Sequence, residues 1–164
     1  DRGMNWHPPS EGRERGILFQ WQIKNVRDAL AALDRRHAQW DLVAYVWMQG
    51  EHEAGISRKM AADYDKLLAN FMRAVRKTLK APSLPFLIGE VNSHKWAYGD
   101  VVRNKQSKVC RDDRNTVLIK TTDLSRNGSG GASHFDADGM LVLGSRFSKA
   151  LNSIAEKHKS EQKR

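Results

Sequence analysis

Residues 45–54 read YVWMQGEHEA, and this stretch decides the fold because two opposite kinds of sequence meet in it. Residues 45–48 are apolar and rich in aromatic and β-branched side chains, which is typical of a buried strand. Residues 49–53 are an amide, a glycine and two acids around a histidine. Two explanations remain open: an ordinary surface loop follows the strand, or the strand delivers these side chains to a reaction.

Helical and strand-like patterns alternate along the whole chain. Apolar residues at helical spacing predict helices over residues 19–33, 58–80, 100–110 and from about 138, and strands are predicted over residues 42–48, 86–91 and 116–121. This order is typical of an α/β fold, in which helices cover both faces of a parallel sheet. Only three strands are visible and the pattern opens with a helix, so at least one strand is predicted to be missing before it.

Polar residues follow each of the three predicted strands. They occupy residues 49–53 after the first strand, 92–94 after the second and 123–136 after the third. In open parallel sheets, ligands bind at the carboxyl ends of the strands. We therefore expect these three loops to meet at one edge of the sheet and to form a site there.

The composition favours one soluble globular domain, predicted over residues 1–158 with a polar tail at 159–164. No apolar run reaches the roughly 20 residues of a membrane span, and no signal peptide is visible. Since the chain starts at Asp1 rather than Met, secretion and compartment stay open. A net charge of +9 is compatible with a polyanion partner, but no phosphate loop or RNA-binding aromatic motif accompanies it. Nucleic-acid binding is therefore not favoured.

The sequence favours neither an internal disulfide nor a metal site. Cys110 is the single cysteine, which excludes an internal disulfide and a cysteine-based zinc site. His52, Glu53 and His94 match no metal-ligand spacing such as H-E-x-x-H, so we expect no metal.

Five segments together resemble a known family. They are WMQGEHEA, GMNWHPP, ADYDKLLANFMRAVRKTL, LPFLIGEV and HFDADGMLVLGSRFSKAL. These segments resemble elements of the sialate O-acetylesterase-like carbohydrate esterases, within the SGNH-hydrolase superfamily. The resemblance implies a three-layer α/β/α, flavodoxin-like parallel sheet and a serine ester hydrolase that removes acetyl groups from O-acetylated sugars. It implies no cofactor, and family members are often secreted or periplasmic.

The chain departs from the family in two places. Family members begin with a strand leading to a G-Q-S-N block whose serine is the nucleophile, and no such block occurs here. We therefore expect a C-terminal portion of an esterase domain or a truncated relative, with a missing segment or a partner completing the sheet. Family members also commonly carry an aspartate three residues before the catalytic histidine, where this chain has Gly131.

The resemblance assigns roles to a small set of residues. His134 is the candidate base, because imidazole can accept and return a proton near neutral pH. Gln49 is the candidate oxyanion donor, and Gly50 lets the backbone approach the substrate closely. Glu51 is the candidate carboxylate that orients His134.

Other assignments remain alternatives. Asp136 or Asp123 could replace Glu51 as the acid partner, although Asp136 is better placed to cap the last helix. Trp6 could shape a sugar or acyl pocket or simply seal the core. Neither Ser93 nor Ser133 has the surroundings of a nucleophile. The rival to an esterase is a non-catalytic carbohydrate-binding or interaction module built on the same scaffold.

Overall fold

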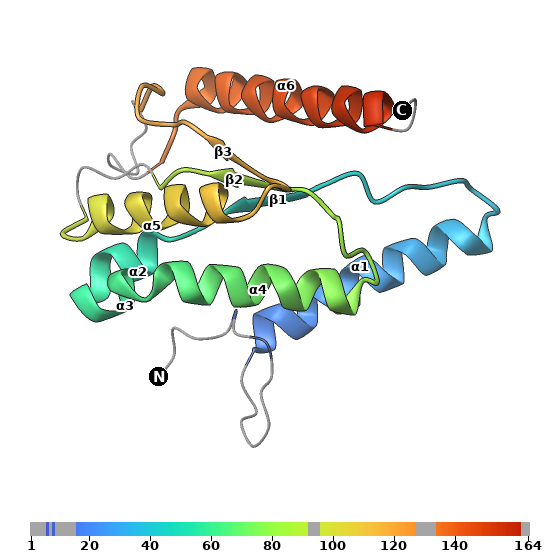
Figure 1. Ribbon diagram of the computed structural model, residues 1–164, viewed down its shortest axis with the longest axis horizontal. Coiled ribbons are helices and arrows are strands. Elements are labelled where there is room, and N and C mark those ends of the chain that lie inside the picture. The colour runs from blue at the N-terminus through green and yellow to red at the C-terminus, as the bar shows by residue number, and fades with distance from the viewer. Residues whose placement is uncertain (1–5, 7, 9–15, 92–95, 127–133, 162–164) are drawn as a thin grey trace. The chain divides into compact units, whose positions relative to one another are not determined.

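The computed structural model describes residues 6, 8, 16–91, 96–126 and 134–161, with side chains to residue 156. The described elements follow one another as α1 (Ile17–Arg35), β1 (Tyr45–Met48), α2 (Glu51–Ile56), α3 (Arg58–Ala62), α4 (Tyr64–Thr78), β2 (Phe86–Gly89), α5 (Gly99–Asp112), β3 (Thr116–Ile119) and α6 (Ala137–Glu161) (Figure 1). The chain forms two compact units. We call Asp1–Leu42 with Lys66–Leu84 the helical unit, and Val43–Asp65 with Pro85–Arg164 the sheet unit.

The sheet unit contains a parallel sheet of three described strands in the order β1-β2-β3. Tyr45 of β1 pairs with Phe86 of β2, which pairs in turn with Thr116 of β3. All four residues of β2 are buried, as expected for the central strand of a parallel sheet covered on both faces. The expected α/β class is therefore confirmed.

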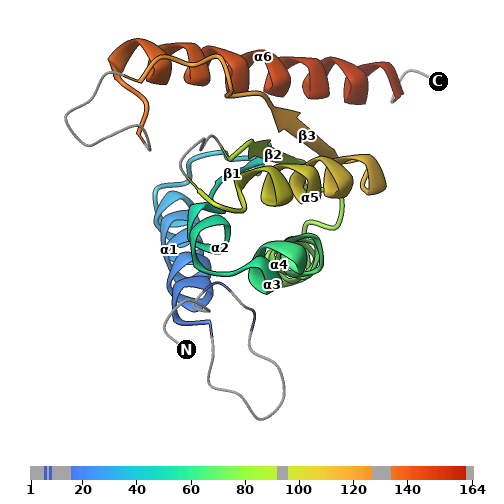
Figure 2. The same ribbon diagram turned by 90° about the vertical axis from the view of Figure 1, so that its left-hand side faces the viewer.

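Helices α5 and α6 lie on opposite faces of this sheet (Figures 1 and 2). On the α6 face, Leu143 is buried in one cluster with Ile119 and Leu124. On the α5 face, Val102 and Gln106 are fully buried. These helix–sheet–helix layers are the arrangement that the alternating sequence predicts.

Strand β1 has no strand partner on its outer edge among the described residues. A Cβ added at Gly89 would meet the sulfur of Met48 and lie 3.4 Å from the Phe147 ring of α6, so Met48 is on the α6 face of the sheet. Because side chains alternate along a strand, Val46 is on that face too. Val46 and Met48 nevertheless remain 54% and 36% exposed. This side of β1 is therefore an uncovered apolar surface.

The helical unit consists of α1 and the larger part of α4. The Phe71 ring packs edge-to-face on the rings of Phe19 and Trp6, with centroid distances of 5.9 and 6.2 Å. The predicted apolar face of α1 is confirmed, because Phe19 and Ile23 are buried and its other three members are half-buried. Among the described residues, no helix has the length and apolar character that crossing a bilayer requires.

Several predicted boundaries were wrong. The helix predicted over 58–80 is two helices that break at Asp63, and α2 directly before them was not predicted. The Ser57 hydroxyl accepts a hydrogen bond from the Met60 backbone N–H and starts α3 as a separate helix. Asp100 lies in the first turn of α5 and does not cap it. Helix α6 ends at Glu161, and the predicted polar tail at 159–164 stays a prediction.

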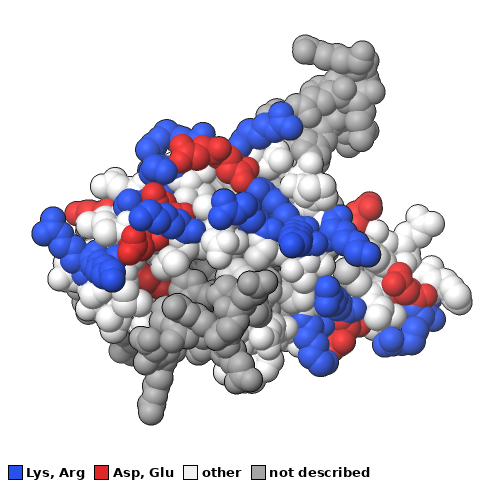
Figure 3. All heavy atoms as spheres, turned by 60° about the horizontal axis from the view of Figure 1, so that its bottom comes forward, with Lys and Arg blue, Asp and Glu red and all other residues white. Residues whose placement is uncertain are grey.

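Positive charge exceeds negative charge in this chain. Figure 3 shows Lys and Arg side chains at many places on the visible face, with Asp and Glu side chains among them. This view agrees with the excess of 28 Lys and Arg over 19 Asp and Glu residues, which gives the net charge of +9.

Candidate functional site

The candidate site begins where β1 turns into α2. Gly50, between the strand and the helix, has φ of 141° and ψ of −8°, a conformation that side-chain-bearing residues rarely adopt. A Cβ at this position would lie 2.5 Å from Val91 Cγ2 and 3.0 Å from Val102 Cγ1. Only glycine therefore allows the chain to leave the strand and start a helix within one residue.

Gln49 is held from both its main chain and its side chain. Its carbonyl oxygen accepts hydrogen bonds from the Tyr64 hydroxyl at 2.7 Å and from the Gln106 amide at 3.3 Å. Its side-chain Nε2 donates to the Glu53 carboxylate at 2.6 Å, and the Tyr64 hydroxyl lies 3.2 Å from its Oε1. A carboxylate can only accept, so Glu53 fixes which end of the amide is the NH₂ group.

Tyr64 and Gln106 support this arrangement from inside the sheet unit. The Trp47 indole donates to the Tyr64 hydroxyl at 3.4 Å, and burial raises the pKa of Tyr64 far above its ordinary value. Tyr64 therefore stays protonated and acts as a donor. Gln106 also accepts from the Val91 N–H at 2.8 Å and donates to the Gly89 carbonyl at 3.2 Å, so it ties the ends of β1 and β2 together.

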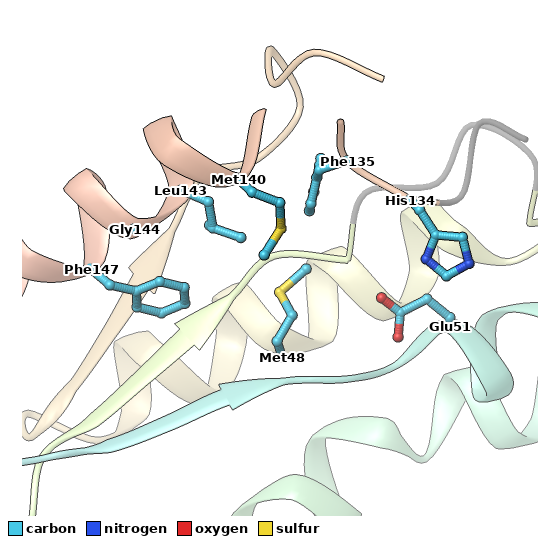
Figure 4. Close-up of a pocket in the computed structure, with 8 residues that line it drawn as sticks. All are labelled: Met48, Glu51, His134, Phe135, Met140, Leu143, Gly144 and Phe147. Atoms are coloured by element: carbon cyan, nitrogen blue, oxygen red, sulfur yellow. The ribbon is translucent and has the colours of Figure 1, made fainter. Parts of the chain in front are cut away.

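Glu51 and His134 line one pocket of about 430 Å³. Glu51 is the first residue of α2, and His134 lies in the segment that leads into α6. The Glu51 and His134 side chains lie next to each other at one end of the pocket (Figure 4). The remaining walls are apolar apart from the backbone of a glycine: Met48, Phe135, Met140, Leu143, Gly144 and Phe147.

This pocket combines a proton acceptor, a carboxylate and an apolar wall. An imidazole beside a carboxylate can take a proton from a hydroxyl, because the carboxylate stabilises the charged ring. The described residues that line the pocket include no serine, threonine or cysteine. The described lining of the pocket thus offers an imidazole and a carboxylate, but no hydroxyl or thiol.

The structure places the other candidate acids elsewhere. The Arg146 guanidinium donates to both carboxylate oxygens of Asp123, at 2.8 and 2.6 Å, and these hydrogen bonds lower the pKa of Asp123 to about 2. Asp136 accepts from the Gly139 backbone N–H at 2.8 Å and so caps α6. Both carboxylates are engaged in structural contacts, whereas Glu51 lines the pocket together with His134.

The structure brings together part of the predicted set. Glu51 and His134 share the pocket, while Gln49 is held by Glu53 beside it and is not among the lining residues. Gly50, between Gln49 and Glu51 in the chain, is buried. Trp6 belongs to the helical unit and packs on Phe71, so its part in a substrate pocket stays a prediction. The predictions for His7, Asn92, Ser93, His94, Gly131 and Ser133 lie outside the described residues.

Sequence reasoning missed three residues of the site. Glu53 was visible as an acid four residues after Gln49, a spacing at which helical side chains meet, but no rule paired the two. Tyr64 was assigned to an apolar helix face, and Gln106 gave no signal beyond being polar within a helix. Among the described residues, no group of three or more His, Cys, Asp or Glu side chains could hold a metal ion.

Cys110 is no alternative nucleophile. It is half-buried, and burial raises the pKa of its thiol to about 12. The reactive thiolate is therefore scarce at neutral pH.

Comparison with known proteins identifies the family of the chain and agrees with its fold. A profile of the family described as "Carbohydrate esterase, sialic acid-specific acetylesterase" matches residues 4–153. A solved structure of an Arabidopsis thaliana protein superposes with a TM-score of 0.74 at 21% sequence identity, over 91% of this chain and 55% of that one. At this identity the likeness shows the fold, and the present chain spans about half the length of that protein. No curated protein matches the sequence. The family match extends over nearly the whole chain, and the chain belongs to the sialic acid-specific acetylesterase family of carbohydrate esterases.

Proposed function

We propose that this chain supplies the base, its carboxylate partner and an oxyanion donor for removing acetyl groups from O-acetylated sugars. The observation that carries the proposal is the pocket shared by Glu51 and His134 at the carboxyl end of β1. Its apolar wall suits the methyl group of an acetyl ester. Family membership supports acetyl-ester chemistry of this kind.

Each polar group has a role in the proposed reaction. His134 removes the proton from an attacking hydroxyl as that oxygen bonds to the acetyl carbon, and then returns the proton to the leaving sugar oxygen. Water attacks the resulting acetyl ester in the same way and releases acetate. Glu51 orients the ring and stabilises its charged form. Gln49 uses one Nε2 hydrogen toward Glu53, which leaves the other available to an oxyanion.

The attacking hydroxyl comes from outside residues 1–164 in this proposal. The described lining of the pocket offers no nucleophile, and among the described residues no strand lies on the outer side of β1, whose Val46 and Met48 side chains are exposed. Parallel sheets are normally covered on both faces. A strand added beside β1 would extend the sheet and end next to the pocket, since the carboxyl ends of parallel strands lie at one edge, and a helix that follows it could pack over Val46 and Met48.

The test measures acetate released from an O-acetylated sugar. Three proteins are compared: the 164-residue chain, the same chain with its upstream in-frame coding sequence, and the extended protein carrying His134→Ala. We expect turnover only from the extended protein and a loss of a thousandfold or more, on the order of other serine hydrolases, in the variant. Full activity of His134→Ala would overturn the base assignment.

A matched pair of variants tests the acid partner in the extended protein. Glu51→Gln should lower turnover by about a hundredfold, because the imidazole loses its charged neighbour. Asp123→Asn should leave the turnover nearly unchanged, because Arg146 already binds the Asp123 carboxylate. Turnover by the unextended chain that is abolished by Ser93→Ala or Ser133→Ala would refute the external nucleophile.

A non-catalytic carbohydrate-binding module is the second candidate, favoured by the absence of a hydroxyl or thiol from the described pocket lining. Saturable binding of the acetylated sugar by an extended protein that releases no acetate would establish it.

A further inference from the structure

A second hollow lies on the helical unit, at the end of α4. It has a volume of about 390 Å³ and is lined by Arg73, Arg76, Lys77, Lys80 and Pro82. Four of these five residues are cations. A hollow lined almost wholly by positive charge is unusual, because like charges at helical spacing repel one another.

The helix geometry explains how these cations converge. Arg73, Arg76 and Lys77 are three and four residues apart, so they share one face of α4. Lys80 follows the helix with φ of 54°, a left-handed conformation that favours glycine or asparagine. This backbone turn places a fourth cation at the hollow, in a conformation unfavourable for lysine.

Helix capping does not account for all of this charge. Cations near a helix C-terminus are stabilising by themselves, but the exposed carbonyl groups here already have donors. The Arg27 guanidinium donates to the Thr78 carbonyl at 3.2 Å, and the Lys80 and Ala81 backbone N–H groups donate to the Lys77 and Arg76 carbonyls at 3.2 and 3.0 Å.

The side chains of Arg73, Lys77 and Lys80 have no carboxylate partner within the described part of the chain. Some cations elsewhere are paired: Lys105 and Lys108 contact Asp65 at 3.1 and 3.5 Å. The charges of Arg73, Lys77 and Lys80 are thus left unbalanced within the described part of the chain, and these three side chains line one hollow.

We propose that this hollow binds a ligand with two or more linked phosphate groups. Arginine forks and lysine ammonium groups both donate charge-assisted hydrogen bonds to phosphate oxygens. The hollow has room for more than one such group. None of its lining residues is aromatic, so it offers no surface for stacking a sugar or base, and recognition rests on the anionic groups alone.

The phosphates could belong to a free oligophosphate or to a nucleic-acid backbone, and the experiment separates these sources. Calorimetry at constant ionic strength measures binding of inorganic phosphate, inorganic tripolyphosphate and a short RNA duplex to the 164-residue chain. We expect tripolyphosphate to bind more tightly than phosphate, because it reaches several cations at once. Tighter binding of the duplex than of tripolyphosphate would identify nucleic acid as the source.

The decisive comparison uses two double variants of equal charge. Arg73→Gln with Lys77→Gln should weaken tripolyphosphate binding by about tenfold or more. Arg58→Gln with Lys59→Gln removes the same charge from exposed positions on α3 and should change it by less than about twofold. Glutamine keeps a high helix propensity, so both variants should fold. Equal weakening by the two variants, or no binding of any ligand, would overturn the proposal, and neither result bears on acetyl-ester hydrolysis.

Discussion

Replacing Gly50 by alanine should destabilise the sheet unit, and the structure allows the size of the effect to be worked out. The backbone at φ 141° costs an alanine about 1–3 kcal/mol. The new methyl group would lie 2.5 Å from Val91 Cγ2 and 3.0 Å from Val102 Cγ1, an overpacking worth about 1–3 kcal/mol more. Alanine also lowers the conformational entropy of the unfolded chain, which stabilises the folded state by about 0.4–1 kcal/mol. The net loss should be about 1–5 kcal/mol in the free energy of unfolding.

Gly144→Ala is the matched control. Gly144 lies inside α6, and a Cβ there meets no atom within 4 Å. The same chemical change should therefore stabilise the protein by about 0.5–1 kcal/mol through helix propensity. Urea unfolding followed by far-ultraviolet circular dichroism measures both variants. A Gly50→Ala protein as stable as the wild type, or equal losses at both positions, would refute the reasoning.

Three further predictions concern capping, pH and thiol reactivity. Asp136→Ala should lower the free energy of unfolding by about 1 kcal/mol in the same urea assay, because the carboxylate caps α6 through the Gly139 N–H; an unchanged midpoint would contradict the capping role. The pKa of Asp123 is lowered to about 2 by Arg146, so its pairing stabilises the fold above the unfolded pKa of about 4 and loses this effect as pH falls toward 2. Arg146→Gln should flatten the pH dependence of stability in that window, and an unaltered acid titration would contradict the pairing. Burial raises the pKa of the Cys110 thiol to about 12, so a disulfide reagent at pH 8 should label the native protein far more slowly than the urea-unfolded protein, and equal rates would contradict it.

Sequence patterns predicted the elements whose identity depends on their own residues. The apolar face of α1 and the continuous apolar run of β2 follow directly from periodicity, and the structure confirms both. The break at Asp63 had no such signal, because residues 58–80 keep a helical composition across it. Periodicity alone therefore could not locate the boundary between α3 and α4.

The site was predictable to the extent that strand ends and family motifs reveal it. The rule that ligands gather at strand carboxyl ends pointed to the segments that carry Glu51 and His134, and both line one pocket. The same rule cannot show which polar residues form hydrogen bonds with one another. Glu53 and Gln106 act through partners that only the fold brings near, and a single sequence does not reveal such pairs.

The network around Gln49 also bears on how stability and function are linked in this family member. A buried hydrogen bond whose partners are removed leaves unsatisfied polar groups, which are costly in a protein interior. Tyr64, Glu53 and Gln106 hold the strand end through such bonds, whereas Met48, a lining residue of the Glu51–His134 pocket, remains exposed. The amide can therefore be positioned before any further segment covers β1. In the proposed reaction, an added strand would supply the hydroxyl, because His134 and Glu51 already share one pocket and the Gln49 amide beside it is already held in place.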